Sequence, residues 1–339
     1  MTNHALWLAV VAACGGGSAA TTPDAPAETD ASVDAANDAG LTTAGRTAAA
    51  MATAQSNALC VAVQPFYWEI GDVNGSLASG SIGDEAATAT TVMAIASASK
   101  WLFGAYAVEK MGGTPEADDI PFFNFTSGYA GFATDSCPAT GTIDDCLAGA
   151  SGMQVADAIG NFDYNGAHLQ KLASVMGDGA MGNAALGAEV QSQIGTDIDI
   201  HYSQPQPAGG VYTSAAVYAV FLRKLLVGSA TPLQIGTQLG ADAVCTNPLT
   251  CATSVYSPIP NSPTSTESWH YGLAHWIEDD PTVGDGAFSS AGSFGFYPWV
   301  DSTRTLYGVL ARKSDPGSGY DSAQCGRLIR KAWVTGSAQ

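Results

Sequence analysis

The spacing of hydrophobic and polar residues changes along this chain between the patterns typical of strands and of helices, and each change marks the start of an expected secondary-structure element. The stretch 58–83, ALCVAVQPFYWEIGDVNGSLASGSIG, is rich in β-favouring residues and contains Asp-Val-Asn-Gly at 72–75, which predicts a β-hairpin. The run 95–111 carries apolar residues at helical spacing and ends in Met-Gly-Gly, which predicts a helix. Strand character returns near the C-terminus at 271–279, 286–301 and 305–314, followed by an amphipathic helix at 320–334 that Asp321 or Ser322 would cap.

Between these two β-rich regions the chain is mostly helical. From about 114 to 265 helical patterns alternate with long loops rich in Pro, Gly and Ser. Strands at both ends with helices between them predict an α+β fold. We expect an antiparallel sheet formed by both chain ends and flanked by helices, with a mostly helical inserted subdomain at about 114–265.

The N-terminus has the pattern of an export signal. Residues 1–14, MTNHALWLAVVAAC, contain an apolar stretch that is too short to span a bilayer but suits a signal peptide. Small residues precede Cys14 as in a bacterial lipobox, so we expect Cys14 to be lipidated. The segment before the apolar stretch has His4 but no lysine or arginine. An ordinary signal peptide cut nearby, or a misplaced start codon, is therefore the alternative.

The next segment has the composition of a disordered tether. TTPDAPAETDASVDAANDAG, within residues 15–50, contains five acidic residues, no basic residue and no aromatic residue. Such a segment buries too little apolar surface to offset the entropy lost on ordering. We expect a tether at 15–50 and a folded domain at 51–339. The protein would then be exported and anchored in the bacterial envelope, facing the periplasm or the cell surface, with its lipid as the contact with the membrane.

Charge and composition narrow the classes of partner. The chain has 12 basic and 31 acidic residues and a net charge of −19. Nucleic-acid binding needs a basic surface, so we expect no nucleic-acid partner. The sequence contains no HExxH segment and no GxGxxG after a strand, so we expect neither a metal nor a nucleotide cofactor.

Six cysteines follow Cys14, and an even number in an exported chain indicates disulfides. Short separations favour Cys137–Cys146 and Cys245–Cys251 as two loop bridges. The remaining pair, Cys60–Cys325, would join the two ends of the folded domain. A zinc site is the alternative, but no CxxC spacing supports it.

A lysine inside the apolar 95–111 run suggests chemistry. Ser97 and Lys100 form Ser-x-x-Lys, and residues three apart share a face of a helix. Serine is a weak nucleophile that needs a base, and a lysine desolvated by apolar neighbours has a lowered pKa and can serve as that base. At a helix N-terminus the backbone N–H of Ser97 can also donate to a developing oxyanion. Ser-x-x-Lys alone is frequent by chance, so the surrounding sequence decides its weight.

Seven ordered segments resemble the serine β-lactamase-related superfamily, which includes class C β-lactamases, D-alanyl-D-alanine carboxypeptidases, family VIII esterases and nylon-oligomer hydrolases. The resemblance covers most of 58–334 and implies a β-lactamase/transpeptidase-like fold. The segments, in chain order, are FYWEIGD with SLASGSIG, AIASASKWLFGAYAVEKMG, CLAGASGM, FDYNGAHLQKLASVM, PAGGVYTSAAVYAVFLRKLL, YGLAHWI and FSSAGSFGFYPWVD.

The resemblance implies a role for each matching residue. Ser97 would be the acylated nucleophile, Lys100 its base, and Tyr164 the residue that relays a proton to the leaving group. The backbone N–H groups of Ser97 and Ser293 would form the oxyanion hole. Alone, Tyr164 would be read as a core tyrosine; its place in the ordered series favours the functional role.

Two departures from the family affect the expected substrate. The family has Tyr-x-Asn, whereas this chain has Tyr164-Asn165-Gly166, so either Asn165 reaches the pocket from a shifted backbone or the asparagine's role is absent. The family's third motif, Lys or His then Thr or Ser then Gly, is replaced in the pocket by Ser290, Ala291 and Gly292. Losing a charge-assisted contact to a substrate carboxylate costs about 1.5–3 kcal/mol.

These departures favour a carboxylesterase or amidase acting on small neutral substrates through an acyl-enzyme, with no cofactor. Two alternatives stay open. One is a β-lactamase or D-Ala-D-Ala-type peptidase acting on the cell wall. The other is a non-catalytic binding lipoprotein that keeps the fold, because two of the motifs are eroded.

Overall fold

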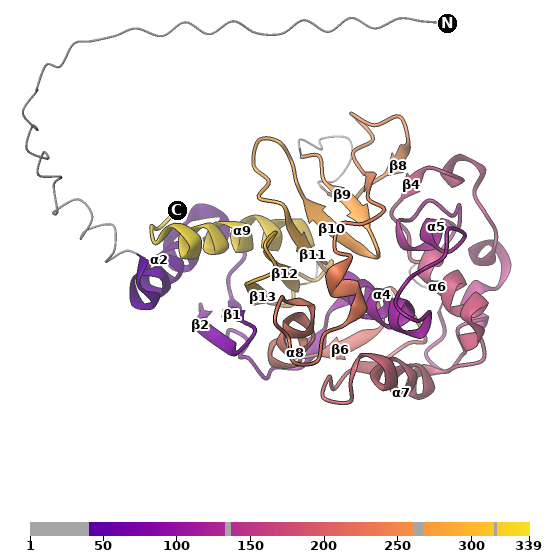
Figure 1. Cartoon of the computed structure of the whole chain (residues 1–339), viewed down its shortest axis with the longest axis horizontal. Helices are drawn as coiled ribbons and strands as arrows, with labels where there is room; N and C mark the ends of the chain where they lie inside the picture. The colour runs from indigo at the N-terminus through magenta and orange to yellow at the C-terminus, as the bar shows by residue number, and fades with distance from the viewer. Residues whose placement is uncertain (1–40, 133–136, 260–266, 315–316) are drawn as a thin grey trace, which may run out of the picture. The chain divides into compact units, whose positions relative to one another are not determined.

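The two ends of the chain meet in one antiparallel sheet (Figure 1). The computed structural model describes residues 41–132, 137–259, 267–314 and 317–339. In this part of the chain eight strands are ordered β2-β1-β13-β12-β11-β10-β9-β7, and all neighbouring pairs are antiparallel. The strands are β1 (Phe66–Asp72), β2 (Gly75–Ile82), β7 (Val244–Cys245), β9 (His270–Gly272), β10 (His275–Glu278), β11 (Ala287–Ser289), β12 (Tyr297–Val300) and β13 (Tyr307–Ala311).

Helices cover both faces of this sheet. All residues of the central strands β12 and β13 are buried, which requires a cover on each side. α9 and α8 both pack on these two strands, and they lie on opposite sides of the sheet in Figure 1. The helices are α2 (Thr43–Ser56), α3 (Ala58–Val61), α4 (Ser99–Lys110), α5 (Ile120–Phe123), α6 (Ala167–Ala173), α7 (Asn183–Ile194), α8 (Ala215–Leu225) and α9 (Gly319–Thr335). The expected α+β fold with a sheet built from both chain ends is confirmed.

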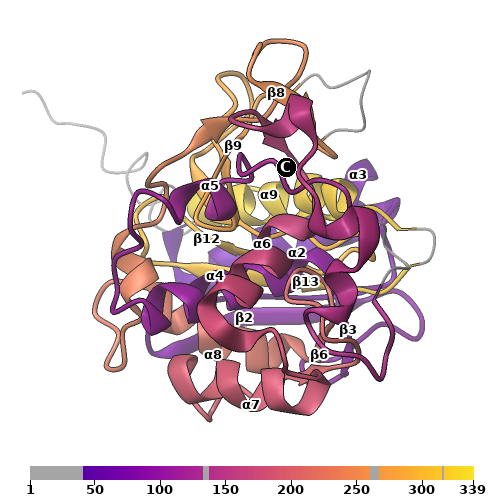
Figure 2. The same ribbon diagram turned by 90° about the vertical axis from the view of Figure 1, so that its right-hand side faces the viewer.

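The segment between α4 and β9 packs around α4 and against the large sheet. Two small sheets form here: β5 (His201–Tyr202) and β6 (Val211–Thr213) pair with β3 (Met93–Ala94), which precedes α4, and β4 (Phe162–Asp163) pairs with β8 (Ser254–Tyr256). α6 and α7 pack along α4 and enclose it (Figure 2). β7 returns to the large sheet and α8 packs on β13, so this stretch is only partly outside the sheet layer.

The hairpin and the C-terminal helix lie where the hydrophobic pattern predicts, but three boundaries differ. The ordered chain begins before Met51, because an alanine-rich helix, α2, starts at Thr43 and buries Ala49, Ala50 and Ala54. Alanine is the best helix former, and packing against α9 supplies the burial that we expected the tether to lack.

The other two differences concern helix starts. Residues Ala58–Val61 form the short helix α3 rather than a strand, with Asn57 as its cap. α9 is capped by Ser318, whose Oγ accepts from the N–H of Asp321, so neither Asp321 nor Ser322 is the cap.

Three disulfides join the six cysteines in the expected pairs. Cys60 and Cys325 link α3 to α9, with their Cα atoms 4.8 Å apart. Cys137–Cys146 and Cys245–Cys251 close two loops. The predicted signal peptide, Cys14 and most of the predicted tether lie outside the described residues. Within the described ranges, no helix has both the length and the apolar character that crossing a membrane requires.

Candidate active site

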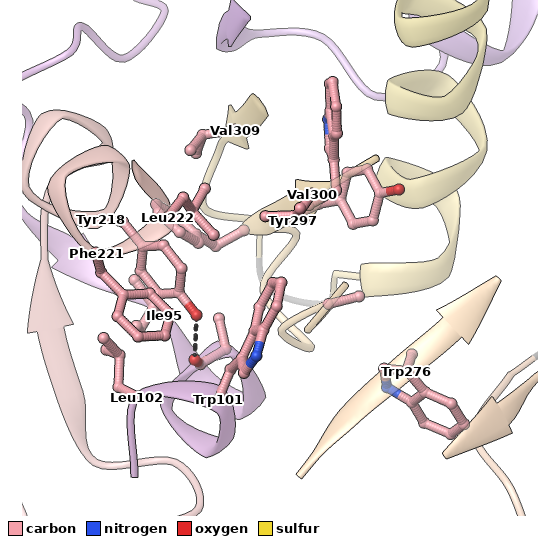
Figure 3. Packing of buried hydrophobic residues seen from close by; sticks show 14 of the residues in the cluster. Ile95, Trp101, Leu102, Tyr218, Phe221, Leu222, Trp276, Tyr297, Val300 and Val309 are labelled. Atoms are coloured by element: carbon pink, nitrogen blue, oxygen red, sulfur yellow. Dashed lines mark hydrogen bonds between the residues drawn. The ribbon is translucent and has the colours of Figure 1, made fainter. Parts of the chain in front are cut away.

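Ser97 lies in a strained 3₁₀ turn, Ala96–Ala98, which leads directly into α4. Ala96, immediately before it, has φ of 46°, in the left-handed region that a residue with a Cβ rarely adopts. Such backbone strain persists only where the surroundings hold it, and it is common at functional sites. The buried side chains after the turn hold it in place: Trp101 and Leu102 lie beside Phe221 and Leu222 of α8 (Figure 3).

Side chains bond each carbonyl of this turn. Ser99 Oγ donates to the carbonyl of Ala96 at 2.7 Å, and Tyr218 Oη donates to that of Ala98 at 2.8 Å. The carbonyl of Ser97 accepts from Ser290 Oγ at 3.1 Å. The turn is therefore fixed from α8 and from the end of β11 at once, which places Ser97 Oγ rigidly at the start of the helix.

Lys100 is buried directly behind Ser97. Its side chain is 4 % exposed, and its Nζ bonds Ser97 Oγ at 2.9 Å and the carbonyl of Ala208 at 2.9 Å. Burial disfavours the charged amine and lowers the pKa of Lys100 to about 7. Among the described residues no carboxylate forms an ion pair with it. A neutral amine within hydrogen-bond reach of a serine hydroxyl can accept its proton.

Tyr164 faces the same two residues. It follows β4, and its backbone N–H donates to the carbonyl of Tyr256 at 3.1 Å. Its ring lies 4.9 Å from Lys100 Nζ. Burial raises the pKa of Tyr164 to about 12. Near neutral pH Tyr164 therefore carries its proton and can donate it.

A small cavity of about 150 Å³ opens at Ser97 and Tyr164. Its other walls include Trp276, Ala291, Ser293, Ser318 and Tyr320. The backbone N–H of Ser293 donates to no acceptor within the described ranges, and that of Ser97 lies in a first helical turn, where N–H groups have no intrahelical acceptor. Both expected oxyanion donors thus belong to residues that line one cavity and remain available to a ligand.

Ser290, Ala291 and Gly292, which replace the family's third motif, differ in their position relative to the cavity. Ala291 lines the cavity. Ser290 was expected to contact the substrate. Its hydroxyl instead donates a hydrogen bond to the carbonyl of Ser97, and the residue is 2 % exposed. Gly292 lies against the turn that contains Ser97, where an added Cβ would collide with the carbonyl of Ile95. Two of these three residues therefore support Ser97 rather than face the cavity.

Substitution Gly292→Ala tests this close approach. A Cβ at this site would force the segment after β11 away from the Ala96–Ala98 turn, and we expect kcat/KM for a small ester to fall about tenfold or more, with about 1–3 kcal/mol lost from the free energy of unfolding. Ester hydrolysis and urea unfolding measure the two effects. The control is Gly187→Ala in α7, where the new Cβ would lie 3.7 Å from its nearest neighbour. Equal activity of the two variants would contradict this account.

Asn165 does not reach the cavity. Its Oδ1 accepts from the N–H of Ala167 at 2.9 Å, and its Nδ2 donates to the carbonyl of Phe132 at 3.3 Å. The expectation that it belongs to the substrate pocket is wrong, because its amide is used to start α6. At Gly166, where the family has asparagine, an added Cβ would lie 3.2 Å from the Cβ of Ala208. The Ala208 carbonyl, which accepts from Lys100, comes from the segment packed against this glycine.

Sequence reasoning missed several lining residues. Trp276, Ser318 and Tyr320 line the cavity, but no chemical motif marks them in the sequence, and the latter two resemble an ordinary helix start. The ring of Trp276 stacks on that of Tyr164, with centroids 5.0 Å apart and planes 24° apart. Tyr320 Oη donates to Glu267 at 2.6 Å. Alternation along β10 could have indicated Trp276, because His275 packs on Trp101 and the next residue must face the other side.

A larger pocket, of about 720 Å³, contains none of the expected site residues. It lies along α9 and is lined by Leu328, Arg330 and Asp285, among others. Arg330 is 2 % exposed and is paired with Asp285 and Glu278. The charge of this buried arginine is therefore neutralised by two carboxylates, and the large volume of the pocket alone does not make it the reactive site.

Comparison with known proteins places this site in a known fold. No family model matches the chain, and no curated protein matches it by sequence. Solved structures do match. They include D-amino acid amidase from Ochrobactrum anthropi SV3 (TM-score 0.59, 11 % identity, 86 % of this chain and 98 % of that one). A β-lactamase from Mycobacterium bovis matches with TM-score 0.57 and 15 % identity, over 81 % and 96 % of the two chains.

Simvastatin synthase from Aspergillus terreus is similar as well, with TM-score 0.56 and 13 % identity over 90 % of this chain and 100 % of that one. At these identities the similarity concerns the fold. The chain has the β-lactamase/transpeptidase-like fold, as the resemblance of its motifs implied.

Proposed function

We propose that this protein is a serine hydrolase that acts through an acyl-enzyme on small neutral esters or amides. The observation that carries the proposal is the 2.9 Å contact between Lys100 Nζ and Ser97 Oγ, made by a buried amine whose pKa is about 7. Ser97 and Ser293, whose backbone N–H groups have no described acceptor, line one cavity, and Lys100 lies directly behind Ser97. That combination is what acyl transfer requires.

The proposed reaction has two halves. Ser97 Oγ attacks the carbonyl carbon while Lys100 takes the hydroxyl proton, and the N–H groups of Ser97 and Ser293 stabilise the oxyanion. Tyr164 gives its proton to the leaving group as the carbonyl–oxygen or carbonyl–nitrogen bond breaks, and the Lys100 ammonium restores the proton of Tyr164. Water then attacks the Ser97 ester by the reverse order of proton transfers and releases the acid.

The walls of the cavity support a neutral substrate. None of the described residues that line it carries a charged side chain. An anionic group placed there would lose its hydration without a cation to pair with. The small volume favours a short acyl group.

A β-lactam or peptide substrate is the second candidate, because similar folds include a protein named as a β-lactamase and one named as a D-amino acid amidase. The test compares initial rates of the wild type on p-nitrophenyl butyrate and on nitrocefin. Faster turnover of the ester supports the proposal, and faster turnover of nitrocefin favours the β-lactamase. If neither substrate is hydrolysed, the remaining alternative is a binding protein that has a hydrolase fold.

Export to an oxidising compartment belongs to the same proposal. Disulfides form and persist outside the reducing cytosol, and the described part of this chain has three. We propose a lipoprotein anchored through Cys14. Incorporation of labelled palmitate into wild type, but not into Cys14→Ser, is the corresponding measurement.

Activity should rise with pH through about 7. Lys100 accepts a proton only when its amine is neutral, and the neutral fraction increases as pH rises through its pKa of about 7. We expect kcat/KM for p-nitrophenyl butyrate to rise about tenfold per pH unit below 7 and to level off above it. Burial lowers the pKa of His168 to about 3 and of His275 to about 4, so neither can cause this rise. A flat profile between about pH 5 and pH 9 would count against Lys100 as the base.

A further inference from the structure

His168 is a buried histidine that the proposed reaction does not use. It lies in α6, shortly after Tyr164 in the chain, and is 0 % exposed. Its Nδ1 lies 2.7 Å from Ser127 Oγ, and its Nε2 lies 2.9 Å from the carbonyl oxygen of Asp163. The imidazole therefore joins the segment at Ser127 to the residue that directly precedes Tyr164.

The partners of the imidazole ring determine its tautomer. A carbonyl oxygen can only accept a hydrogen bond, so Nε2 carries the ring proton and donates to Asp163. Burial lowers the pKa of His168 to about 3, so the ring is neutral near pH 7 and Nδ1 accepts from the hydroxyl of Ser127. Ser127 is itself held, because its N–H donates to the carbonyl of Pro121 at 2.9 Å and its carbonyl accepts from Gln154 at 2.7 Å. The imidazole is thus bound to a fixed part of the chain.

The bond from His168 fixes one peptide group. The carbonyl of Asp163 and the N–H of Tyr164 belong to the same planar peptide. His168 donates to this carbonyl at 2.9 Å, and the N–H donates to the carbonyl of Tyr256 at 3.1 Å. Both polar atoms of the peptide group are therefore bound. Removal of either bond would allow the group to rotate, and the side chain of Tyr164 would move with it.

Phe125 connects the imidazole to the phenol ring as well. Its ring stacks on that of His168, with centroids 4.8 Å apart and planes 10° apart, and lies 5.6 Å from the ring of Tyr164. Its carbonyl accepts from the N–H of Asp163 at 3.1 Å. His168 therefore has two kinds of contact beside Tyr164, a hydrogen bond and ring packing, which separate substitutions can distinguish.

We propose that His168 is a positioning residue: its Nε2–H holds the peptide group before Tyr164 and so sets the direction in which the Tyr164 hydroxyl delivers its proton to the leaving group. The inference rests on the proposed function and specifies how one of its steps is supported. His168 keeps its own hydrogen throughout, while the proton passes from Tyr164 Oη to the departing oxygen or nitrogen. The hydroxyl stands at the far end of the side chain from Cα, so a small backbone rotation displaces it. A misplacement of about 1 Å can cost about 10²-fold in rate.

Two substitutions separate the hydrogen bond from the packing. His168→Phe keeps a ring against Phe125 but removes the donor, whereas His168→Gln keeps an N–H near the position of Nε2 but removes the ring. p-Nitrophenolate departs without a proton, whereas ethoxide must be protonated as it leaves. For ethyl butyrate we expect kcat/KM to fall about 10- to 100-fold in His168→Phe, through kcat, and less than about fivefold in His168→Gln. For p-nitrophenyl butyrate we expect both variants to lose less than about threefold.

Two kinetic results would overturn the proposal. If His168→Phe hydrolyses ethyl butyrate faster than His168→Gln does, His168 acts through packing and not through its N–H. If each variant loses equally on both esters, the site is disturbed in general, because a general disturbance does not depend on the leaving group. Thermal unfolding shows that the rates belong to folded protein. His201→Phe, which changes an exposed histidine, is the control and should match the wild type on both esters.

A second measurement does not depend on activity. The chain has five histidines, and in the NMR spectrum of the ¹⁵N-histidine-labelled protein His168→Gln identifies the ring signals of His168. We expect a proton on Nε2 and none on Nδ1. In Ser127→Ala the Nδ1 signal should move downfield, because its donor is gone, whereas in Ser192→Ala, which changes an exposed hydroxyl, it should stay.

The NMR result also separates this inference from the proposed function. A proton on Nδ1 would exclude the assigned bond to Asp163 and would overturn the inference even if both esters are hydrolysed. If the tautomer is as assigned but the wild type hydrolyses neither ester, the proposed function fails, and the catalytic part of this inference fails with it.

Discussion

Ser97→Ala is expected to lower kcat/KM for p-nitrophenyl butyrate by at least about 10³-fold, to the background rate. The substitution removes the atom that forms the covalent intermediate, and no neighbouring group can replace it. Stability should hardly change. Among the described residues, Ser97 Oγ has one hydrogen bond, with Lys100, and Lys100 keeps its bond to the carbonyl of Ala208. Initial rates and thermal unfolding of the two proteins measure both effects.

A matched control separates chemistry from general perturbation. Ser192→Ala removes an exposed hydroxyl in α7 that bonds the carbonyl of Glu189, and it should leave the rate unchanged. Mass spectrometry after quenching should find an added butyryl group on the wild type and none on Ser97→Ala. Equal rates for wild type and Ser97→Ala would remove the proposed nucleophile. If both are at background and nitrocefin is also untouched, the binding-protein alternative replaces the hydrolase.

Lys100→Met should reduce activity and raise stability at the same time. A positioned base contributes about 10²–10⁴-fold to rate, so kcat/KM should fall by that factor. Methionine is about as long as lysine and has a similar apolar stem, but it has no amine that loses its hydration when it is buried. Because the pKa of Lys100 falls to about 7 on folding, folding at neutral pH opposes protonation of this amine. The expected gain in the free energy of unfolding is about 2–4 kcal/mol at pH 7.

The sign of the pH dependence makes this result specific. Between the folded pKa of about 7 and the higher unfolded value, the unfolded chain binds the proton more tightly than the folded chain. Wild-type stability therefore rises as pH rises through this range, and the advantage of Lys100→Met shrinks. Urea unfolding at about pH 7 and about pH 9.5 measures the difference. The control is Lys331→Met, an exposed lysine with the same loss of charge, for which we expect neither effect. If Lys100→Met were less stable than the wild type, the conclusion that the buried Lys100 amine lowers the free energy of unfolding would be wrong.

Local patterns predicted the framework of this protein because they report on burial. Alternation around 72–75 indicated the hairpin β1–β2, and the apolar run around Lys100 indicated the helix that places it behind Ser97. Short separations indicated the two loop disulfides and left Cys60 to meet Cys325. Each of these signals lies within a few residues or follows from elimination, so a single sequence contains it.

The parts that could not be predicted depend on contacts between distant segments. Asn165 stands beside Tyr164 in sequence, yet its amide bonds Phe132 and the start of α6. The helical state of 43–50 depends on packing against α9 at the other end of the chain. Ser290 supports Ser97 across 193 residues. Spacing within one sequence does not encode such pairings, so the pocket residues were less predictable than the nucleophile and its base.

The meeting of the chain ends has a consequence for how this protein is made. β1 needs β13 as its neighbour, Arg46 in α2 bonds the carbonyls of Trp333 and Val334, and Cys60 needs Cys325. During synthesis the edge of β1 that pairs with β13 therefore stays unpaired until nearly the whole chain has left the ribosome. A nonsense mutation that removes only α9 would keep β13 but would uncover the side of β12 and β13 on which α9 packs and leave Cys60 as a free thiol. Loss of the last 21 residues, 319–339, should thus direct the product to proteolysis rather than yield a weakened enzyme.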